Sequence, residues 1–160
     1  FQPEQVVIEF KHPSIPGAEI DTVIVADNRL PAVALEFKYD RVANSTSPKP
    51  QKAGALFADL SRLLRFDKVL TRYFVYLTDE DMARYLEKAD HGLDQFFKLR
   101  TGETLKIDLA FLKVCPPTFH KRMGEWPGAA TLYAIRSQEL PLEHQLRIYE
   151  VKKSAAAATV

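Results

Sequence analysis

The stretch that decides the fold is Ala32–Lys38, which reads Ala-Val-Ala-Leu-Glu-Phe-Lys. Its valine, leucine and phenylalanine alternate with its alanines, glutamate and lysine, which is the two-residue period of a β-strand. Successive side chains of a strand point to opposite faces, so Glu36 and Lys38 share one face and Phe37 lies on the other. The sequence therefore predicts a strand that presents a carboxylate and an amine side by side.

A second strand is predicted at Ile20–Val25, and the turn-forming residues 26–31 separate it from the first. The two strands are expected to form an antiparallel hairpin. A turn centred between Asn28 and Arg29 sets Asp21 directly opposite Glu36, where cross-strand Cβ atoms are about 5 Å apart. A slip of one residue would turn one carboxylate to the other face. The register therefore decides whether the two acids converge.

Two converging carboxylates beside an amine have a chemical use. Carboxylate oxygens suit Mg²⁺ or Mn²⁺, which keep several waters and bind substrate phosphates. A bound metal polarises a phosphoryl oxygen, and an ammonium orients water or neutralises charge that develops on the phosphate. These parts together hydrolyse a phosphodiester. The alternative is that Asp21 and Glu36 are solvated residues of an exposed sheet face, with Lys38 paired to one of them.

Composition indicates a soluble globular protein. The chain has 160 residues, of which 46% are hydrophobic and 27% are charged, and this is enough to build one compact core. We expect a single domain over residues 1–153 and a low-complexity tail over 154–160. No apolar run approaches the ~18 residues of a membrane span. The single Cys115 predicts a buried structural thiol in a cytoplasmic protein. The net charge of +1 excludes a strongly basic protein, although a local basic patch remains open.

The order of predicted elements over residues 6–77 resembles the core of the PD-(D/E)XK nuclease superfamily, which has the restriction-endonuclease-like fold. That core has a helix, three antiparallel strands, a second helix and a strand that joins the sheet. The counterparts predicted here are strands Gln5–Lys11, Ile20–Val25 and Val33–Lys38, a helix at Ala55–Asp67 and a strand at Arg72–Leu77. The expected fold class is α/β (α+β), with a mixed central sheet flanked by helices and extra C-terminal strands.

The same resemblance implies a site. Asp21, Glu36 and Lys38 stand where the family has its metal-binding acids and its catalytic lysine. It implies that Asp21, Glu36 and the backbone carbonyl of Phe37 hold Mg²⁺ (or Mn²⁺), and that Lys38 assists the attacking water. The products would be a 5′-phosphate and a 3′-hydroxyl.

The chain departs from the family pattern in two ways. Ile20, not proline, precedes the first acid, and no helix is evident in residues 1–5 before the first strand. Some family members carry a further glutamate on that helix. Glu4 and Glu9 are the candidates for a partial substitute.

Polar residues near the predicted helix are candidate substrate contacts. The segment Ala43–Gly54 is rich in serine, proline and lysine and predicts a loop. We consider Gln51, Lys52, Arg62 and Arg65 as candidates to bind phosphate. Arg62 could instead form a surface pair with Asp59, three residues earlier.

The C-terminal half is less informative. Strands predicted at Ala130–Arg136 and Gln145–Lys152 would extend the sheet or form a separate β layer. The proline-rich segment Cys115–Gly128 is predicted to be irregular, and Lys121-Arg122 beside Trp126 suits either a single nucleic-acid strand or simple packing. His12 is expected in an exposed turn.

Two functions of different classes remain. The first is a Mg²⁺-dependent endonuclease or exonuclease, with DNA favoured over RNA as substrate. The second is a catalytically inactive nucleic-acid or protein-interaction module on the same fold, because fold alone does not fix activity. A homodimer or a separate recognition domain is a candidate partner in either case.

Overall fold

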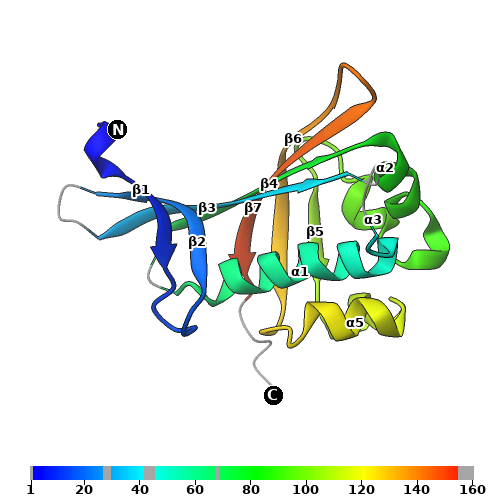
Figure 1. Ribbon diagram of the computed structural model, residues 1–160, viewed down its shortest axis with the longest axis horizontal. Helices are drawn as coiled ribbons and strands as arrows, with labels where there is room; N and C mark the ends of the chain where they lie inside the picture. The colour runs from blue at the N-terminus through cyan, green and yellow to red at the C-terminus, as the bar shows by residue number, and fades with distance from the viewer. Residues whose placement is uncertain (1, 27–29, 42–45, 68, 155–160) are drawn as a thin grey trace.

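The computed structural model describes residues 2–26, 30–41, 46–67 and 69–154 (Figure 1). The strands are β1 Val6–Lys11, β2 Glu19–Val25, β3 Pro31–Asp40, β4 Thr71–Thr78, β5 Thr104–Ile107, β6 Ala130–Leu140 and β7 His144–Lys153. The α-helices are α1 Lys49–Arg65, α2 Glu80–Leu86, α3 Asp94–Phe97, α4 Leu109–Leu112 and α5 Pro117–Met123, with short 3₁₀ turns at Pro3–Gln5 and Ala89–His91. The fold is α+β, and its strands form one mixed sheet that helices flank.

The sheet has the strand order β1-β2-β3-β4-β7-β6-β5. β1, β2 and β3 form an antiparallel meander, and β3 then pairs in parallel with β4. Parallel neighbours need a crossover connection, which α1 provides. β7 lies between β4 and β6 and is antiparallel to both. The predicted C-terminal strands therefore extend the central sheet and do not form a separate layer.

The predicted register of the β2–β3 hairpin is confirmed. Thr22 pairs with Leu35 and Val23 pairs with Ala34, so the next residue of each strand sets Asp21 opposite Glu36. The predicted turn centre between Asn28 and Arg29 lies outside the described residues. The predicted register holds from Thr22 to Ile24 and shifts by one residue next to the turn, where Val25 pairs with Pro31.

The long helix α1 lies across one face of the sheet and carries much of the core (Figure 1). Leu56, Leu60 and Leu63 follow helical spacing and are fully buried. The ring of Phe57 extends this contact to three further aromatic residues, with centroid distances of 5.2 Å to Phe96, 5.2 Å to Phe119 and 6.0 Å to Trp126. These aromatic contacts join α1 to α3 and α5.

The two faces of β3 have different surroundings. Ala34, Glu36 and Asp40 are buried on the face that α1 covers, whereas Phe37 and Tyr39 on the other face are each 51% exposed. The residues predicted to carry the chemistry therefore lie on the covered face of the sheet.

Two helix predictions were wrong. α1 begins at Lys49, six residues before the predicted start, and part of the predicted loop is helical. α5 occupies Pro117–Met123, inside the segment predicted to be irregular. Both helices carry a proline in the first turn, where the missing N–H costs nothing and the fixed φ favours the helix. Proline in these segments therefore marks helix starts and not loops.

Among the described residues, no helix is long and apolar enough to cross a membrane.

Candidate functional site

The site begins where β2 separates from β3. The hairpin ladder reaches Thr22 and Leu35, and beyond it the carboxylate of Asp21 takes the place of a backbone acceptor. Its Oδ2 accepts a hydrogen bond of 2.7 Å from the backbone N–H of Phe37. Since the N–H and C=O of one strand residue point to the same side, the carbonyl of Phe37 also faces β2. This is the carbonyl that the family resemblance names as a metal ligand.

Glu36 lies beneath α1 and is only 1% exposed. Arg62 of α1 binds both of its oxygens, with distances of 2.8 Å from Nε to Oε1 and 2.9 Å from Nη2 to Oε2. The pKa of Glu36 is raised to about 8, mainly by burial and also by the Asp21 carboxylate, against the opposing effect of the Arg62 guanidinium. The hairpin register sets Asp21 opposite Glu36, as predicted.

Lys38 shares the covered face but does not pair with Glu36. Its Nζ lies 3.0 Å from Oδ2 of Asp59, and the other oxygen of Asp59 lies 3.1 Å from Nη1 of Arg62. The charged groups form a continuous chain from Lys38 through Asp59 and Arg62 to Glu36. The predicted Asp59–Arg62 pair is present, but Arg62 is only 27% exposed and also binds the sheet. It is therefore more than a surface pair.

The donor set near Asp21 suits a hard divalent cation. Two carboxylates and a backbone carbonyl provide only oxygen ligands and leave positions for water and substrate, as Mg²⁺ requires. Within the described parts of the chain, no group of three or more His, Cys, Asp or Glu side chains is arranged as a metal site. Both oxygens of Glu36 are bound to Arg62. A cation such as Mg²⁺ could therefore reach Glu36 only after Arg62 had released it.

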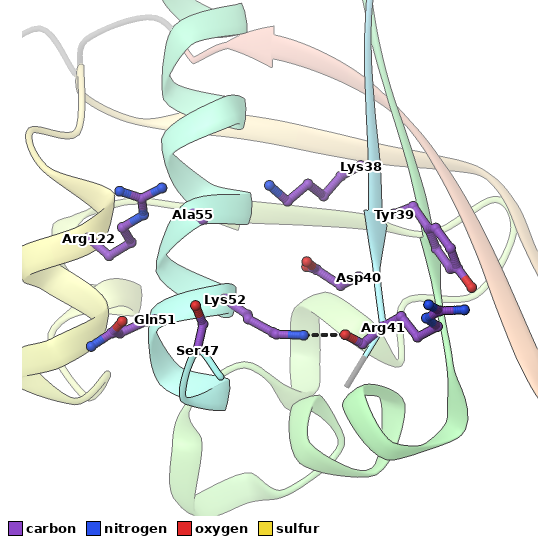
Figure 2. A pocket seen from close by; sticks show the side chains of 9 residues that line it. All are labelled: Lys38, Tyr39, Asp40, Arg41, Ser47, Gln51, Lys52, Ala55 and Arg122. Atoms are coloured by element: carbon purple, nitrogen blue, oxygen red, sulfur yellow. Dashed lines mark hydrogen bonds between the residues drawn. The ribbon is translucent and has the colours of Figure 1, made fainter. Parts of the chain in front are cut away.

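A polar cavity of about 760 Å³ adjoins this cluster (Figure 2). It is lined by Lys38, Tyr39, Asp40, Arg41, Ser47, Gln51, Lys52, Ala55 and Arg122. Figure 2 shows the side chains of Lys38 and Asp40 extending from β3 towards α1, and Arg122 on α5 beyond that helix. Of the predicted substrate contacts, Gln51 and Lys52 line this cavity.

Arg65 does not join this site. Its Nη2 lies 3.1 Å from the carboxylate of Glu125, outside the set of cavity residues. Trp126 is buried against Phe57 and cannot act as an open stacking surface. Within the predicted cluster of Lys121, Arg122 and Trp126, the tryptophan therefore packs in the core, whereas Arg122 lines the cavity.

His12 was also placed wrongly by the sequence. It is buried, and its ring packs against Phe66 while Nε2 lies 3.1 Å from the carbonyl oxygen of Arg62. Burial lowers the pKa of His12. It therefore supports the C-terminal end of α1, next to the arginine that binds Glu36.

Two residues that line the cavity were missed as functional candidates, Asp40 and Arg41. Asp40 continues the even-numbered face of β3, so the strand period carried a signal for it. Arg122 was considered only together with Lys121 and Trp126, and nothing in the sequence indicated that the packing of α5 on α1 brings it to the cavity.

No family model, curated protein or solved structure matches the chain.

Proposed function

We propose that this chain is a Mg²⁺-dependent nuclease that hydrolyses phosphodiester bonds, with DNA as the favoured substrate. One observation carries the proposal. Asp21 and Glu36 approach each other from neighbouring strands on the face beneath α1, and Lys38 follows on the same face. Two acids and an amine with this arrangement are the minimum set for metal-assisted attack of water on a phosphodiester.

Each residue has a role in this proposal. Asp21, Glu36 and the carbonyl of Phe37 would hold the ion, which when bound supplies Lewis-acid polarisation and a more acidic water. The ammonium of Lys38, positioned by Asp59 at 3.0 Å, would orient the attacking water and neutralise charge on the phosphate. Water adds to phosphorus, the bond to the 3′-oxygen breaks, and the leaving oxygen takes up a proton. This gives the 5′-phosphate and 3′-hydroxyl that the family resemblance implies.

The arrangement of the elements supports the proposal. Three antiparallel strands, the crossover helix α1 and the parallel strand β4 follow each other in the order of the PD-(D/E)XK core. The predicted acids lie on β2 and β3 of that order, at the point where the two strands separate.

A second function is favoured by a different observation. Arg62 binds both oxygens of Glu36, and Asp59 binds Lys38, so the charged groups satisfy one another within the protein. A closed network of this kind is also what a catalytically inactive nucleic-acid or protein-interaction module would need to keep buried charges paired.

Cleavage assays separate the two functions. Supercoiled plasmid, single-stranded DNA and RNA are incubated with the protein in Mg²⁺, Mn²⁺ or EDTA. We expect metal-dependent cutting that falls by about 10²-fold or more in Glu36→Ala and Lys38→Ala. The exposed residues Glu139 and Lys113 provide matched controls, and Glu139→Ala and Lys113→Ala should cut like the wild type. Cutting that survives Glu36→Ala would refute the site, and a wild type that cuts nothing would favour the inactive module.

A further inference from the structure

The cavity in Figure 2 concentrates positive charge. Of the four basic residues that line it, Lys38, Lys52 and Arg122 lie on the side of β3 that α1 covers, with the single acid Asp40. The side chain of Arg41 extends from the other side of β3, beside Tyr39 (Figure 2). The whole chain has a net charge of only +1, so this excess is local. Asp40 is 7% exposed, and burial raises its pKa. The positive charges of Lys38 and Lys52 act on this pKa in the opposite direction.

Most of these cations are not neutralised inside the protein. Lys38 is paired with Asp59, and the ammonium of Lys52 donates to the uncharged backbone carbonyl of Arg41. In the described ranges, no carboxylate forms an ion pair with Arg41, Lys52 or Arg122. Grouped positive charge in a concave site raises the local concentration of anions. The cavity is thus suited to a ligand with several negative charges.

The position of Arg122 is set by unusually close helix packing. A Cβ placed on Gly54 of α1 would lie 2.5 Å from the carbonyl oxygen of Phe119 and 2.9 Å from Cβ of Arg122. Only glycine permits α5 to approach α1 this closely. The guanidinium of Arg122 therefore stands beside α1 on a helix that is held in place, and not on a loop.

We propose that this cavity binds the phosphodiester backbone of a single nucleic-acid strand next to the bond that is cut. The proposal rests on the proposed nuclease function, because Lys38 belongs to both the cavity and the catalytic cluster. Arg122 and Lys52 bind successive phosphates, and the strand runs from Lys38 across the N-terminal half of α1 to α5. A cavity of about 760 Å³ has the size of a small-molecule site and holds about one or two nucleotides, but not a double helix.

Binding can be measured without cleavage. The probe is a fluorescein-labelled 20-mer of deoxythymidine in EDTA, and the measurement is fluorescence anisotropy over a series of salt concentrations. Each phosphate contact to a single strand contributes about −0.7 to the slope of log affinity against log salt. We expect Arg122→Ala and Lys52→Ala each to weaken binding and to make this slope less steep by about 0.7. When salt rises from 50 to 200 mM, the affinity of each variant should therefore fall by a factor that is about 2.6 times smaller than the factor for the wild type.

Lys121 provides the matched control. It is exposed and adjacent to Arg122 on the same helix, but it does not line the cavity. Lys121→Ala should keep the wild-type affinity and slope. The assignment of the cavity is overturned if Arg122→Ala binds like the wild type, or if Lys121→Ala loses as much. Tighter binding of a duplex of the same length would overturn the single-strand assignment.

The two proposals fail in different ways. If the 20-mer binds through Arg122 but Mg²⁺ supports no cutting, the cavity assignment survives and the nuclease function fails. If cutting depends on Glu36 while Arg122→Ala binds normally, the nuclease survives and the cavity assignment fails. Far-ultraviolet circular dichroism of each variant establishes that the fold is retained.

Discussion

Arg62 offers the sharpest test of how the site is held together. Glu36 is only 1% exposed, and in Arg62→Ala it loses two charge-assisted hydrogen bonds of 2.8 and 2.9 Å. Breaking a buried ion pair by removing one partner costs about 3–5 kcal/mol, since it leaves a buried charge uncompensated. For a chain of this length, 1 kcal/mol corresponds to roughly 2–4 °C in the midpoint of thermal unfolding. Because the pKa of Glu36 is already about 8, the carboxyl can take up a proton at pH 8.5 and limit this cost, so we expect the midpoint to fall by at most roughly 20 °C.

The loss should depend on pH in a definite direction. Burial raises the pKa of Glu36 from 4.5 to about 8 in the folded protein, so between these values the folded state binds a proton that the unfolded state has released. Stability from this group is complete below pH 4.5 and is lost as pH rises through about 8. Removing Arg62 removes the cation that opposes this shift, so the variant should suffer most at alkaline pH. At pH 5.5, where Glu36 is largely protonated, the cost of Arg62→Ala should be markedly smaller.

Arg65 makes the experiment well controlled. It lies one helical turn from Arg62 and pairs with Glu125, a residue whose side chain is 85% exposed. Exposed ion pairs contribute at most about 1 kcal/mol, so Arg65→Ala should shift the midpoint by no more than a few degrees at either pH. Equal losses in Arg62→Ala and Arg65→Ala, or a loss for Arg62→Ala that does not grow with pH, would refute the interpretation of Arg62 as the partner of a buried carboxylate.

Mg²⁺ extends this test to the proposed metal site. A ligand that binds only the folded state stabilises it by RT ln(1 + [L]/Kd). In the wild type Mg²⁺ must displace Arg62 from Glu36, whereas in Arg62→Ala the carboxylate is free. We expect 10 mM Mg²⁺ to raise the unfolding midpoint of Arg62→Ala more than that of the wild type. A larger increase in the wild type would contradict competition between Arg62 and the metal.

Three further predictions concern single residues. Asp21→Asn keeps an oxygen that can accept the 2.7 Å hydrogen bond from the backbone N–H of Phe37, but it loses the negative charge. Calorimetry should therefore show weakened Mg²⁺ binding, with an unfolding midpoint within a few degrees of the wild type. Unchanged Mg²⁺ binding would contradict the role of Asp21 as a ligand. Gly54→Ala should lower the free energy of unfolding measured in urea, because a Cβ at this position would lie 2.5 Å from the carbonyl oxygen of Phe119. The overpacking costs about 1–3 kcal/mol and outweighs the ~1 kcal/mol gained in helix propensity. A stabilised variant would contradict the close contact. The Cys115 thiol is buried and burial raises its pKa to about 11, so a disulfide reagent at pH 8 should label it slowly in the native protein and quickly in denaturant; rapid native labelling would show that it is accessible.

The sequence predicted the strands of the β2–β3 hairpin and their pairing, because the period of a strand and a short turn depend on residues that are close in the chain. The alternation in β3 and a turn centred between Asn28 and Arg29 predicted the register that brings Asp21 to Glu36, and the pairs from Thr22–Leu35 to Ile24–Val33 follow it. The N-terminal boundary of α1 was wrong because proline was taken as a loop signal, although it fits the first turn of a helix. The same misreading concealed α5, and with it the route by which Arg122 reaches the cavity.

The partners of the acids could not be predicted in the same way. The sequence shows Asp59 and Arg62 three residues apart on a helix, which also describes many surface pairs. Whether they turn to water or to the sheet depends on the rotation of α1, which the burial of Leu56, Leu60 and Leu63 sets. Each of the two charged residues directly precedes one of these leucines, so both lie at the edge of the buried face. That position was a usable signal for contact with β3.

The network of ion pairs that joins Lys38, Asp59, Arg62 and Glu36 is compatible with both candidate functions. Two carboxylates that converge in a partly buried place repel each other and lose hydration, so a protein that holds them without a metal must neutralise them from within. A metal site without its ion therefore needs a cation such as Arg62, just as an inactive module would. The number of ion pairs cannot distinguish these cases. The two cases differ in the free energy that Mg²⁺ needs to displace Arg62 from Glu36. The difference between the Mg²⁺-induced shifts of the unfolding midpoint in Arg62→Ala and in the wild type measures this free energy.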